Sequence, residues 1–227
     1  MKILFYVFTI LFLVNCGSST SDKNIVVKTF TEKYPIHKNI TVTVFWAGEP
    51  PSSENGHISN VYSAWNGEWE NAYGGFDSPY DRAGYHPAGF TPKENPFYFA
   101  LPYNDFEVNG TKKTDLSYIP WAIPDDDKKE SICKNRWVKI IYKGKIAYAQ
   151  WEDVGPFGED DEAYVFGTAK PKNQINDNAG FDVSPAVRDY LDLTGINKVD
   201  WVFVDDEDVP DGPWKEIVTT SGINWVY

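Results

Sequence analysis

Short apolar runs separated by polar, turn-forming stretches dominate the chain and predict β-strands. Three of these runs, at 41–46, 97–101 and 199–204, are rich in β-branched and aromatic side chains, which favour extended backbone. Between the first two runs, residues 47–96 contain many Gly, Pro, Asn and Asp residues with scattered aromatics. This stretch predicts a long, elaborated loop region without a helix.

Two further runs predict a β-hairpin. Residues 136–142 and 145–151 are both rich in aliphatic and aromatic side chains, and Lys143-Gly144 lies between them. A two-residue connection with Gly suits the tight turn of a hairpin, because Gly tolerates positive φ. We therefore expect these two strands to be neighbours in one sheet.

One helix is expected, in the segment that follows Ser184. Ser184 is a good N-cap, and Pro185 suits the first helical position. Val187 and Leu191 stand four apart and therefore share one face. Gly195 is expected to end the helix.

The N-terminus has the pattern of an export signal. Lys2 precedes an apolar run over residues 3–14, which is too short for a membrane-spanning helix of about 20 residues. Cys16 and a polar stretch over 17–22 follow the run. This arrangement resembles a bacterial lipobox, in which the Cys becomes the lipid-modified first residue of the mature protein.

The lipobox resemblance divides the chain into three parts. We expect a lipoprotein signal peptide at 1–15, a tether at 16–38 and a folded domain at 39–227. Two or more acyl chains on Cys16 anchor a protein stably to a membrane, whereas a single chain does not. The expected location is therefore outside the cytoplasm, lipid-anchored to a bacterial membrane. The alternative is an ordinary signal peptide followed by an incidental Cys.

Composition and charge exclude several classes of protein. The 227 residues carry 21 Lys and Arg against 33 Asp and Glu, and this net charge of −12 argues against a nucleic-acid partner. The 9 Trp, 14 Tyr and 14 Phe provide too much apolar surface for a disordered chain. Two cysteines exclude a disulfide framework, and Cys133 is expected to be a structural thiol.

Motifs for metal, dinucleotide and nucleotide binding are missing from the sequence, so neither a cofactor nor a metal site is predicted. Acidic runs occur at 125–127, 159–162 and 205–208. Ca²⁺ prefers such oxygen-rich surroundings, but the runs lack EF-hand spacing. We expect them to be solvated loops.

Three segments, in this order along the chain, resemble a known fold. The strand at 147–151 leads into Asp153-Val154-Gly155-Pro156-Phe157, then Phe181-Asp182-Val183-Ser184 opens a short helix, and then Gly195 precedes the strand at 199–204. The fold is the double-psi β-barrel shared by rare lipoprotein A, expansins, barwin-like proteins and family 45 endoglucanases. The resemblance covers residues 97–204, with 41–46 as the first strand. It implies an all-β fold, a six-stranded double-psi β-barrel with long loops and one or two short helices.

One position departs from the enzymes of this group. In lytic transglycosylases of the rare lipoprotein A type, a His stands three residues before the Leu of a Leu-Pro pair. Here the pair is Leu101-Pro102, and the position is occupied by Tyr98. The three histidines of the chain all lie elsewhere. This departure favours an expansin-like protein, which binds and loosens glycans without hydrolysing them.

Asp153 and Asp182 are the candidate catalytic residues. Glycosidic cleavage needs a carboxylic acid to protonate the leaving oxygen. Asp153 follows an apolar strand and precedes a Gly-Pro turn, so we expect it at the mouth of the barrel, with its proton partly held by desolvation. The alternatives are a turn-stabilising role for Asp153 and, for Asp182, hydrogen bonds to loop or helix N–H groups.

Aromatic side chains are the second functional signal. Six of them lie in one Gly- and Asn-rich stretch: Trp65, Trp69, Tyr73, Phe76, Tyr80 and Tyr85. Sugars pack their C–H faces on such rings, so the stretch predicts a glycan-stacking groove. The residues predicted to bind glycan are Trp65, Trp69, Tyr73, Tyr98 and Trp151. The alternative is that the rings form a small core within the long loop.

The expected function is that of a cell-envelope lipoprotein that binds or remodels a polysaccharide, with peptidoglycan as the expected polymer. Two other functions stay open. One is a lytic transglycosylase or glycosidase with Asp153 as general acid, and the other is a non-catalytic structural or interaction protein. A common groove for Asp153 and Asp182 favours sugar chemistry, whereas a buried Asp153 bonded only to backbone favours the structural role.

Overall fold

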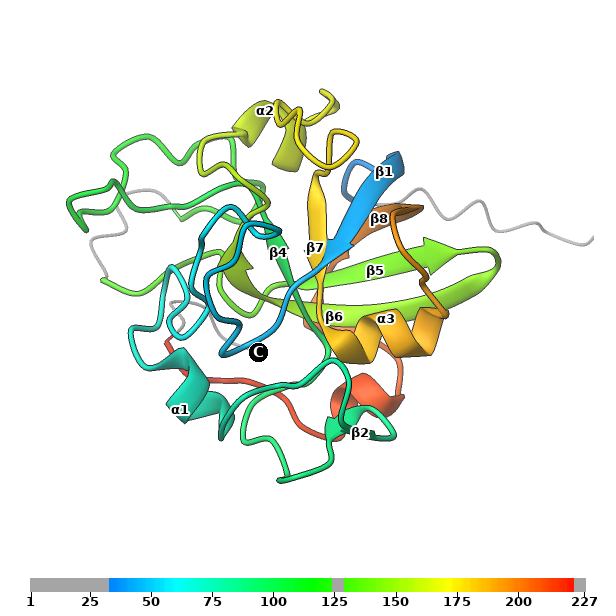
Figure 1. Cartoon of the computed structure of the whole chain (residues 1–227). Helices are drawn as coiled ribbons and strands as arrows, with labels where there is room; N and C mark the ends of the chain where they lie inside the picture. The colour runs from blue at the N-terminus through cyan, green and yellow to red at the C-terminus, as the bar shows by residue number, and fades with distance from the viewer. Residues whose placement is uncertain (1–32, 124–128, 223–227) are drawn as a thin grey trace, which may run out of the picture. The chain divides into compact units, whose positions relative to one another are not determined.

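A computed structural model describes residues 33–123 and 129–222 of the chain (Figure 1). Eight strands, three short α-helices and two 3₁₀ turns follow one another in these residues. The six strands that form the barrel are β1 (His37–Val44), β4 (Tyr98–Leu101), β5 (Trp137–Tyr142), β6 (Lys145–Val154), β7 (Phe181–Val183) and β8 (Asn197–Val204). The remaining elements are α1 (Trp69–Tyr73), β2 (Arg82–Ala83), β3 (His86–Pro87), α2 (Glu162–Val165), α3 (Pro185–Leu191), η1 (Asp206–Asp208) and η2 (Pro213–Lys215).

The six strands close into a barrel in the order β1-β7-β4-β6-β5-β8. The β1–β7 and β4–β6 pairs are parallel, and the other four pairs are antiparallel. Figure 1 shows β1 and β7 side by side, although they are far apart in the sequence. The predicted all-β class is confirmed, and the closed six-stranded mixed barrel is compatible with a double-psi arrangement.

The predicted hairpin is confirmed. Strands β5 and β6 pair in antiparallel register from Tyr142 opposite Lys145 to Trp137 opposite Gln150. Lys143 and Gly144 both have positive φ, at 46° and 83°. Positive φ at both central residues is the signature of the type I′ turn, whose twist matches that of the flanking strands.

The predicted helix forms as α3, but it ends earlier than expected. The Ser184 hydroxyl accepts a hydrogen bond from the Val187 N–H at 3.2 Å, and Pro185 occupies the first position. The helix stops at Leu191 because Asp192 adopts the left-handed conformation and its N–H bonds back to the last turn. The prediction that Gly195 ends the helix is therefore wrong.

The structure also differs from expectation at both ends of β1, at Tyr34 and in the long loop region. Strand β1 ends at Val44, two residues before the predicted end, and begins at His37, inside the segment assigned to the tether. Tyr34 also packs into the core, and its hydroxyl donates to Asp205 at 2.7 Å. The loop region that was expected to lack a helix contains the single-turn helix α1.

Aromatic rings fill much of the barrel interior. Successive side chains of a strand point to opposite faces, so each strand contributes to the interior and to the outer surface of the barrel. In β4, Phe99 and Leu101 point into the main core, while Tyr98 and Ala100 join a second, smaller cluster outside the barrel. That cluster also contains Phe45, Ala47, Trp69 and Tyr73. The long loop region over 45–90 therefore covers the outer face of β4.

Several predictions lie outside the described residues. These are the signal peptide over 1–15, the lipidation of Cys16 and the acidic run at 125–127. Cys133 is buried and forms no disulfide among the described residues. The helices of this part of the chain all lack the length and apolar character that a membrane crossing requires. Likewise, none of its His, Cys, Asp and Glu side chains gather in threes to hold a metal ion.

Candidate functional site

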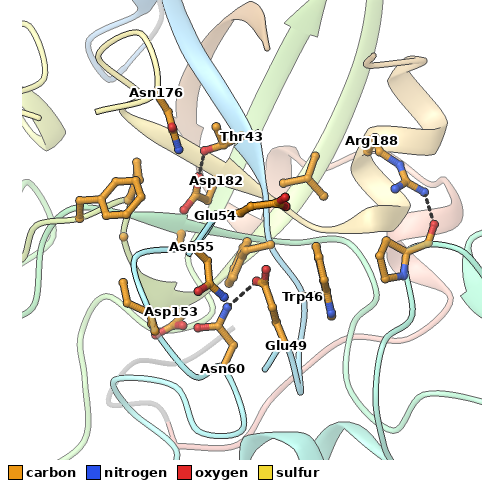
Figure 2. A pocket seen from close by; sticks show the side chains of 18 of the residues that line it. Thr43, Trp46, Glu49, Glu54, Asn55, Asn60, Asp153, Asn176, Asp182 and Arg188 are labelled. Carbon is orange, nitrogen blue, oxygen red and sulfur yellow. Dashed lines mark hydrogen bonds between the residues drawn. The ribbon is translucent and has the colours of Figure 1, made fainter. Parts of the chain in front are cut away.

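An open cleft of about 390 Å³ lies where β1, β6 and β7 meet the long loop (Figure 2). Its acidic lining residues are Glu49, Glu54, Asp153 and Asp182, its amides are Asn55, Asn60 and Asn176, and its aromatic residues are Phe45, Trp46, Tyr80 and Phe157. Arg188 is the one Lys or Arg among the described residues of the lining, and it donates to the Pro79 carbonyl at 2.7 Å. The two predicted catalytic residues therefore share a single cleft.

A β-bulge in β6 places Asp153 at the cleft. The register between β4 and β6 runs from Phe99 opposite Trp151 directly to Ala100 opposite Asp153, so Glu152 is an extra residue. Trp151 points into the main core, whereas Asp153 lies beside Ala100, whose side chain faces the cleft. The bulge thus allows two consecutive acidic side chains to leave the barrel interior.

Strand β7 brings Asp182 to the same place from the other side of β4. Asp182 pairs in register with Ala100, while its neighbours Phe181 and Val183 point into the core. A Cβ atom at Gly155, just after Asp153, would lie 3.5 Å from Asp182 Oδ2. The two aspartates therefore flank one small side chain on one face of the sheet.

The Asp153 carboxyl group is buried, with 7% of the residue exposed. Its Oδ1 accepts hydrogen bonds from the backbone N–H groups of Ala64 and Val154, both at 2.8 Å. Burial raises the pKa of Asp153 to about 7, against the effect of these two hydrogen bonds, and the charge of Asp182 acts in the same direction as burial. Asp153 therefore exchanges its proton near neutral pH.

Asp182 is partly buried and behaves similarly. Burial raises its pKa to about 7, the hydrogen bond from the Thr43 hydroxyl opposes this, and the charge of Glu49 adds to it. Thr43 lies on β1 and donates to Asp182 Oδ1. Two carboxyl groups with raised pKa values thus line one cleft, which makes both of them candidates for proton transfer.

Glu49 is a cleft residue that the sequence analysis missed. It is buried, accepts a hydrogen bond from Asn60 Nδ2 at 2.9 Å, and has a pKa raised by burial. Trp46 was assigned to a strand, but it lies beyond the end of β1 and lines the cleft. Local sequence carries no signal for either placement, because both depend on how the loop after β1 folds back.

Four of the five residues predicted to bind glycan are buried and present no ring face to a ligand. Trp69, Tyr73 and Tyr98 belong to the second cluster, and Trp151 belongs to the main core. The prediction is therefore corrected for these four, whose rings found partners inside the protein. Trp65 is partly exposed, but it packs edge-on against Trp151 and donates its indole N–H to Asn104 at 3.1 Å.

Tyr98 is held by hydrogen bonds in the second cluster. Its hydroxyl donates to Asp77 Oδ2 at 2.8 Å and accepts from the Ala47 N–H at 2.9 Å. Complete burial raises the pKa of Tyr98 well above 10. Tyr98 is thus a structural hydrogen-bonding group and is not among the cleft residues.

Tyr80 is the ring of the aromatic stretch that does reach the cleft. It is 89% exposed and lines the cleft, as does Phe157 in the turn after β6.

Comparison of the chain with protein-family models, with curated proteins and with solved structures found no match. Any assignment of function therefore depends on the geometry of this cleft and on the short motifs that form it.

Proposed function

We propose that this protein is an exported, lipid-anchored envelope protein of the double-psi β-barrel group, and that it binds a polysaccharide in the cleft in an expansin-like manner. Peptidoglycan is the proposed polymer. One observation carries the proposal: Asp153 and Asp182 open into the same cleft as the rings of Trp46 and Tyr80. Carboxyl groups suit sugar hydroxyls, and aromatic faces suit sugar C–H groups.

The polar lining of the cleft supports a hydroxyl-rich ligand. Asn55, Asn60 and Asn176 add amide donors and acceptors beside the carboxyl groups. Pockets generally combine apolar walls with a few polar groups that fix the orientation of the ligand. The exposed face of Tyr80 provides such a wall, and it is free of the internal packing that holds Trp69 and Tyr73.

Binding without cleavage is favoured by the position of Tyr98. In the lytic transglycosylases that the motifs resemble, a His accompanies the Asp, whereas here a buried Tyr replaces it. The raised pKa of Tyr98 makes its hydroxyl a poor proton donor at neutral pH. The catalytic group that the enzymes add is therefore missing from the matching position.

Glycosidic cleavage is the second candidate, and the pKa of Asp153 is the observation that favours it. A pKa of about 7 leaves a substantial fraction of this carboxyl group protonated at neutral pH, as a general acid requires. Asp182 is then a second carboxyl group across the cleft, since two strand spacings separate the backbones by about 10 Å.

A sedimentation assay with insoluble peptidoglycan tests the proposed function. We expect the wild-type protein to bind and Tyr80→Ala to weaken binding roughly tenfold, which corresponds to loss of about 1.4 kcal/mol of stacking. Tyr62→Ala is the matched control, because Tyr62 is 58% exposed and does not line the cleft. Asp153 is buried, and its carboxyl group accepts hydrogen bonds only from the backbone N–H groups of Ala64 and Val154 among the described residues, which favours the structural role. Absence of binding together with absence of cleavage would establish that role.

A further inference from the structure

The backbone of Asp153 is held from the core side by Trp151. The indole Nε1–H of Trp151 donates to the carbonyl oxygen of Asp153 at 2.8 Å, and both groups are buried. The Trp151 ring stacks on Phe99 within the main core, with 6.0 Å between centroids. A ring fixed in this way gives the carbonyl one donor in one direction, and so restrains the peptide plane that follows Asp153.

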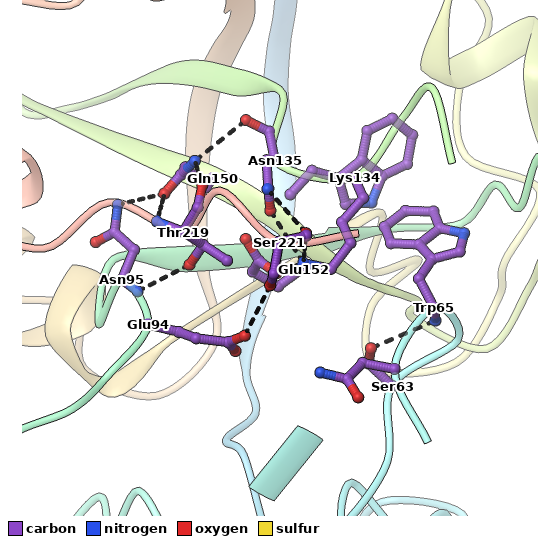
Figure 3. Close-up of polar contacts among 12 residues, drawn as sticks. Ser63, Trp65, Glu94, Asn95, Lys134, Asn135, Gln150, Glu152, Thr219 and Ser221 are labelled. Atoms are coloured by element: carbon purple, nitrogen blue, oxygen red, sulfur yellow. Dashed lines mark hydrogen bonds and ion pairs between the residues drawn. The ribbon is translucent and has the colours of Figure 1, made fainter. Parts of the chain in front are cut away.

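The other side of the bulge is held by a buried ion pair (Figure 3). Lys134 Nζ lies 3.1 Å from Glu152 Oε2, and both side chains are at most 2% exposed. Lys134 also donates to the Ser221 carbonyl at 2.8 Å and to Asn135 Oδ1 at 3.2 Å. Glu152, the extra residue of the bulge, therefore forms an ion pair with Lys134, and Lys134 is hydrogen-bonded to Ser221 in the C-terminal segment.

Glu94 is a second acidic group near this pair. Burial raises the pKa of Glu152 to about 7, Lys134 opposes this, and Glu94 adds to it. Glu94 accepts a hydrogen bond from the Ser221 hydroxyl at 3.3 Å. Replacing one member of the pair alone would leave a buried charge, so the pair is best tested by replacing both members with apolar residues.

A bulge needs such restraints, because its extra residue takes no part in the regular ladder. We propose that Trp151 and the Lys134–Glu152 pair are positioning residues that set the direction in which the Asp153 carboxyl group enters the cleft. This inference deepens the proposed function, because it concerns a carboxyl group of the same site. Trp151, which the sequence analysis assigned to glycan binding, then acts through Asp153 and not on the ligand.

The test is a ¹³C NMR titration of the Asp153 carboxyl carbon, assigned by its loss in Asp153→Asn. In Trp151→Phe, which removes the indole N–H, we expect the pKa of Asp153 to fall by about one unit or more, as the released carboxyl group gains solvent. Trp137→Phe is the matched control. Trp137 is as deeply buried, but its indole N–H has no hydrogen-bond partner among the described residues.

An unchanged pKa in a folded Trp151→Phe protein overturns the role of Trp151, and so does an equal fall in Trp137→Phe. If Trp151→Phe does not fold, benzothienylalanine at position 151 keeps the shape of the side chain and removes only the donor. The double variant Lys134→Met/Glu152→Leu tests the outer restraint by the same titration. A fall in the pKa of Asp153 supports that restraint, and an unchanged value overturns it.

The titration needs no glycan, so its failure is distinct from failure of the proposed function. Peptidoglycan sedimentation across pH 5 to 8 then connects the two. If the inference holds, Trp151→Phe shifts the midpoint of the pH dependence of binding by the same amount as the NMR titration, whereas Trp137→Phe does not. A change in affinity without a shift of the midpoint indicates a purely structural effect and contradicts the positioning role.

Discussion

Asp153 and Asp182 approach the same residue, Ala100 of β4, from opposite sides: Asp153 pairs with it from the parallel strand β6, and Asp182 from the antiparallel strand β7. Residues that are opposite one another in a sheet point to the same face, so both carboxyl groups project beside the small Ala100 methyl group. Burial raises the pKa of each to about 7. At neutral pH a substantial fraction of both carboxyl groups is therefore protonated and uncharged.

Protein stability should decrease as the pH rises through this range. An unfolded Asp titrates near 3.9, whereas folded Asp153 titrates at about 7, so between these values the folded state binds more protons. The free energy of unfolding then falls as the pH increases from about 4 to 7, by at most about 4 kcal/mol for this group. Asp153→Asn should remove this contribution, because the amide oxygen still accepts from Ala64 and Val154.

Urea unfolding of both proteins at pH 5 and pH 8 measures this effect. We expect Asp153→Asn to be more stable than wild type at pH 8 and similar to it at pH 5. An equal difference between the proteins at both pH values would show that Asp153 titrates normally.

Asp153→Asn also separates the enzyme from the binder. A carboxamide of nearly the same shape cannot deliver a proton, so any release of soluble fragments from peptidoglycan should fall by about 10²- to 10⁴-fold. Binding to the insoluble polymer should change far less than cleavage, since Trp46 and Tyr80 are intact, but its dependence on the protonation of Asp153 should disappear. We expect wild type to release no fragments. Release of anhydro-muropeptides by wild type, lost in Asp153→Asn, would instead establish the transglycosylase.

Tyr98→Phe should destabilise the fold without changing glycan binding. The substitution removes a hydroxyl that joins Asp77 Oδ2 to the Ala47 N–H in the second cluster, and leaves polar groups in a buried place with fewer partners. We expect a loss of about 1–3 kcal/mol in the free energy of unfolding. Thermal unfolding and peptidoglycan sedimentation are the two measurements. Unchanged stability with weaker binding would place Tyr98 in contact with the glycan.

Cys16 should be the acylated N-terminus of the mature protein. An apolar run ends just before it and a polar stretch follows, and two or more acyl chains are needed for stable anchoring. Metabolic labelling with a fatty acid should mark the wild-type protein and not Cys16→Ala. Label that persists in the variant contradicts the lipoprotein assignment.

The sequence by itself determined the features that depend on neighbouring residues. The β5–β6 hairpin follows from two β-forming runs around Lys143-Gly144, and the start of α3 follows from Ser184 and Pro185. The end of the helix was not predictable in this way. The helix ends where Asp192 adopts the left-handed conformation, although Gly195 is the better candidate by residue type. The choice of Asp153 and Asp182 came from short motifs, and both residues do line the cleft.

Only the tertiary structure decided which aromatic side chains are exposed and which acidic side chains lie in the same cleft. Trp69 and Tyr80 are aromatic residues of the same Gly- and Asn-rich stretch. Trp69 is nevertheless buried in the second cluster and Tyr80 is 89% exposed, because burial depends on packing between distant segments. The bulge at Glu152 and the pairing of both aspartates with Ala100 likewise require strands β4, β6 and β7 to be assembled. Strand order and register arise from contacts across the whole barrel, and no window of neighbouring residues contains them.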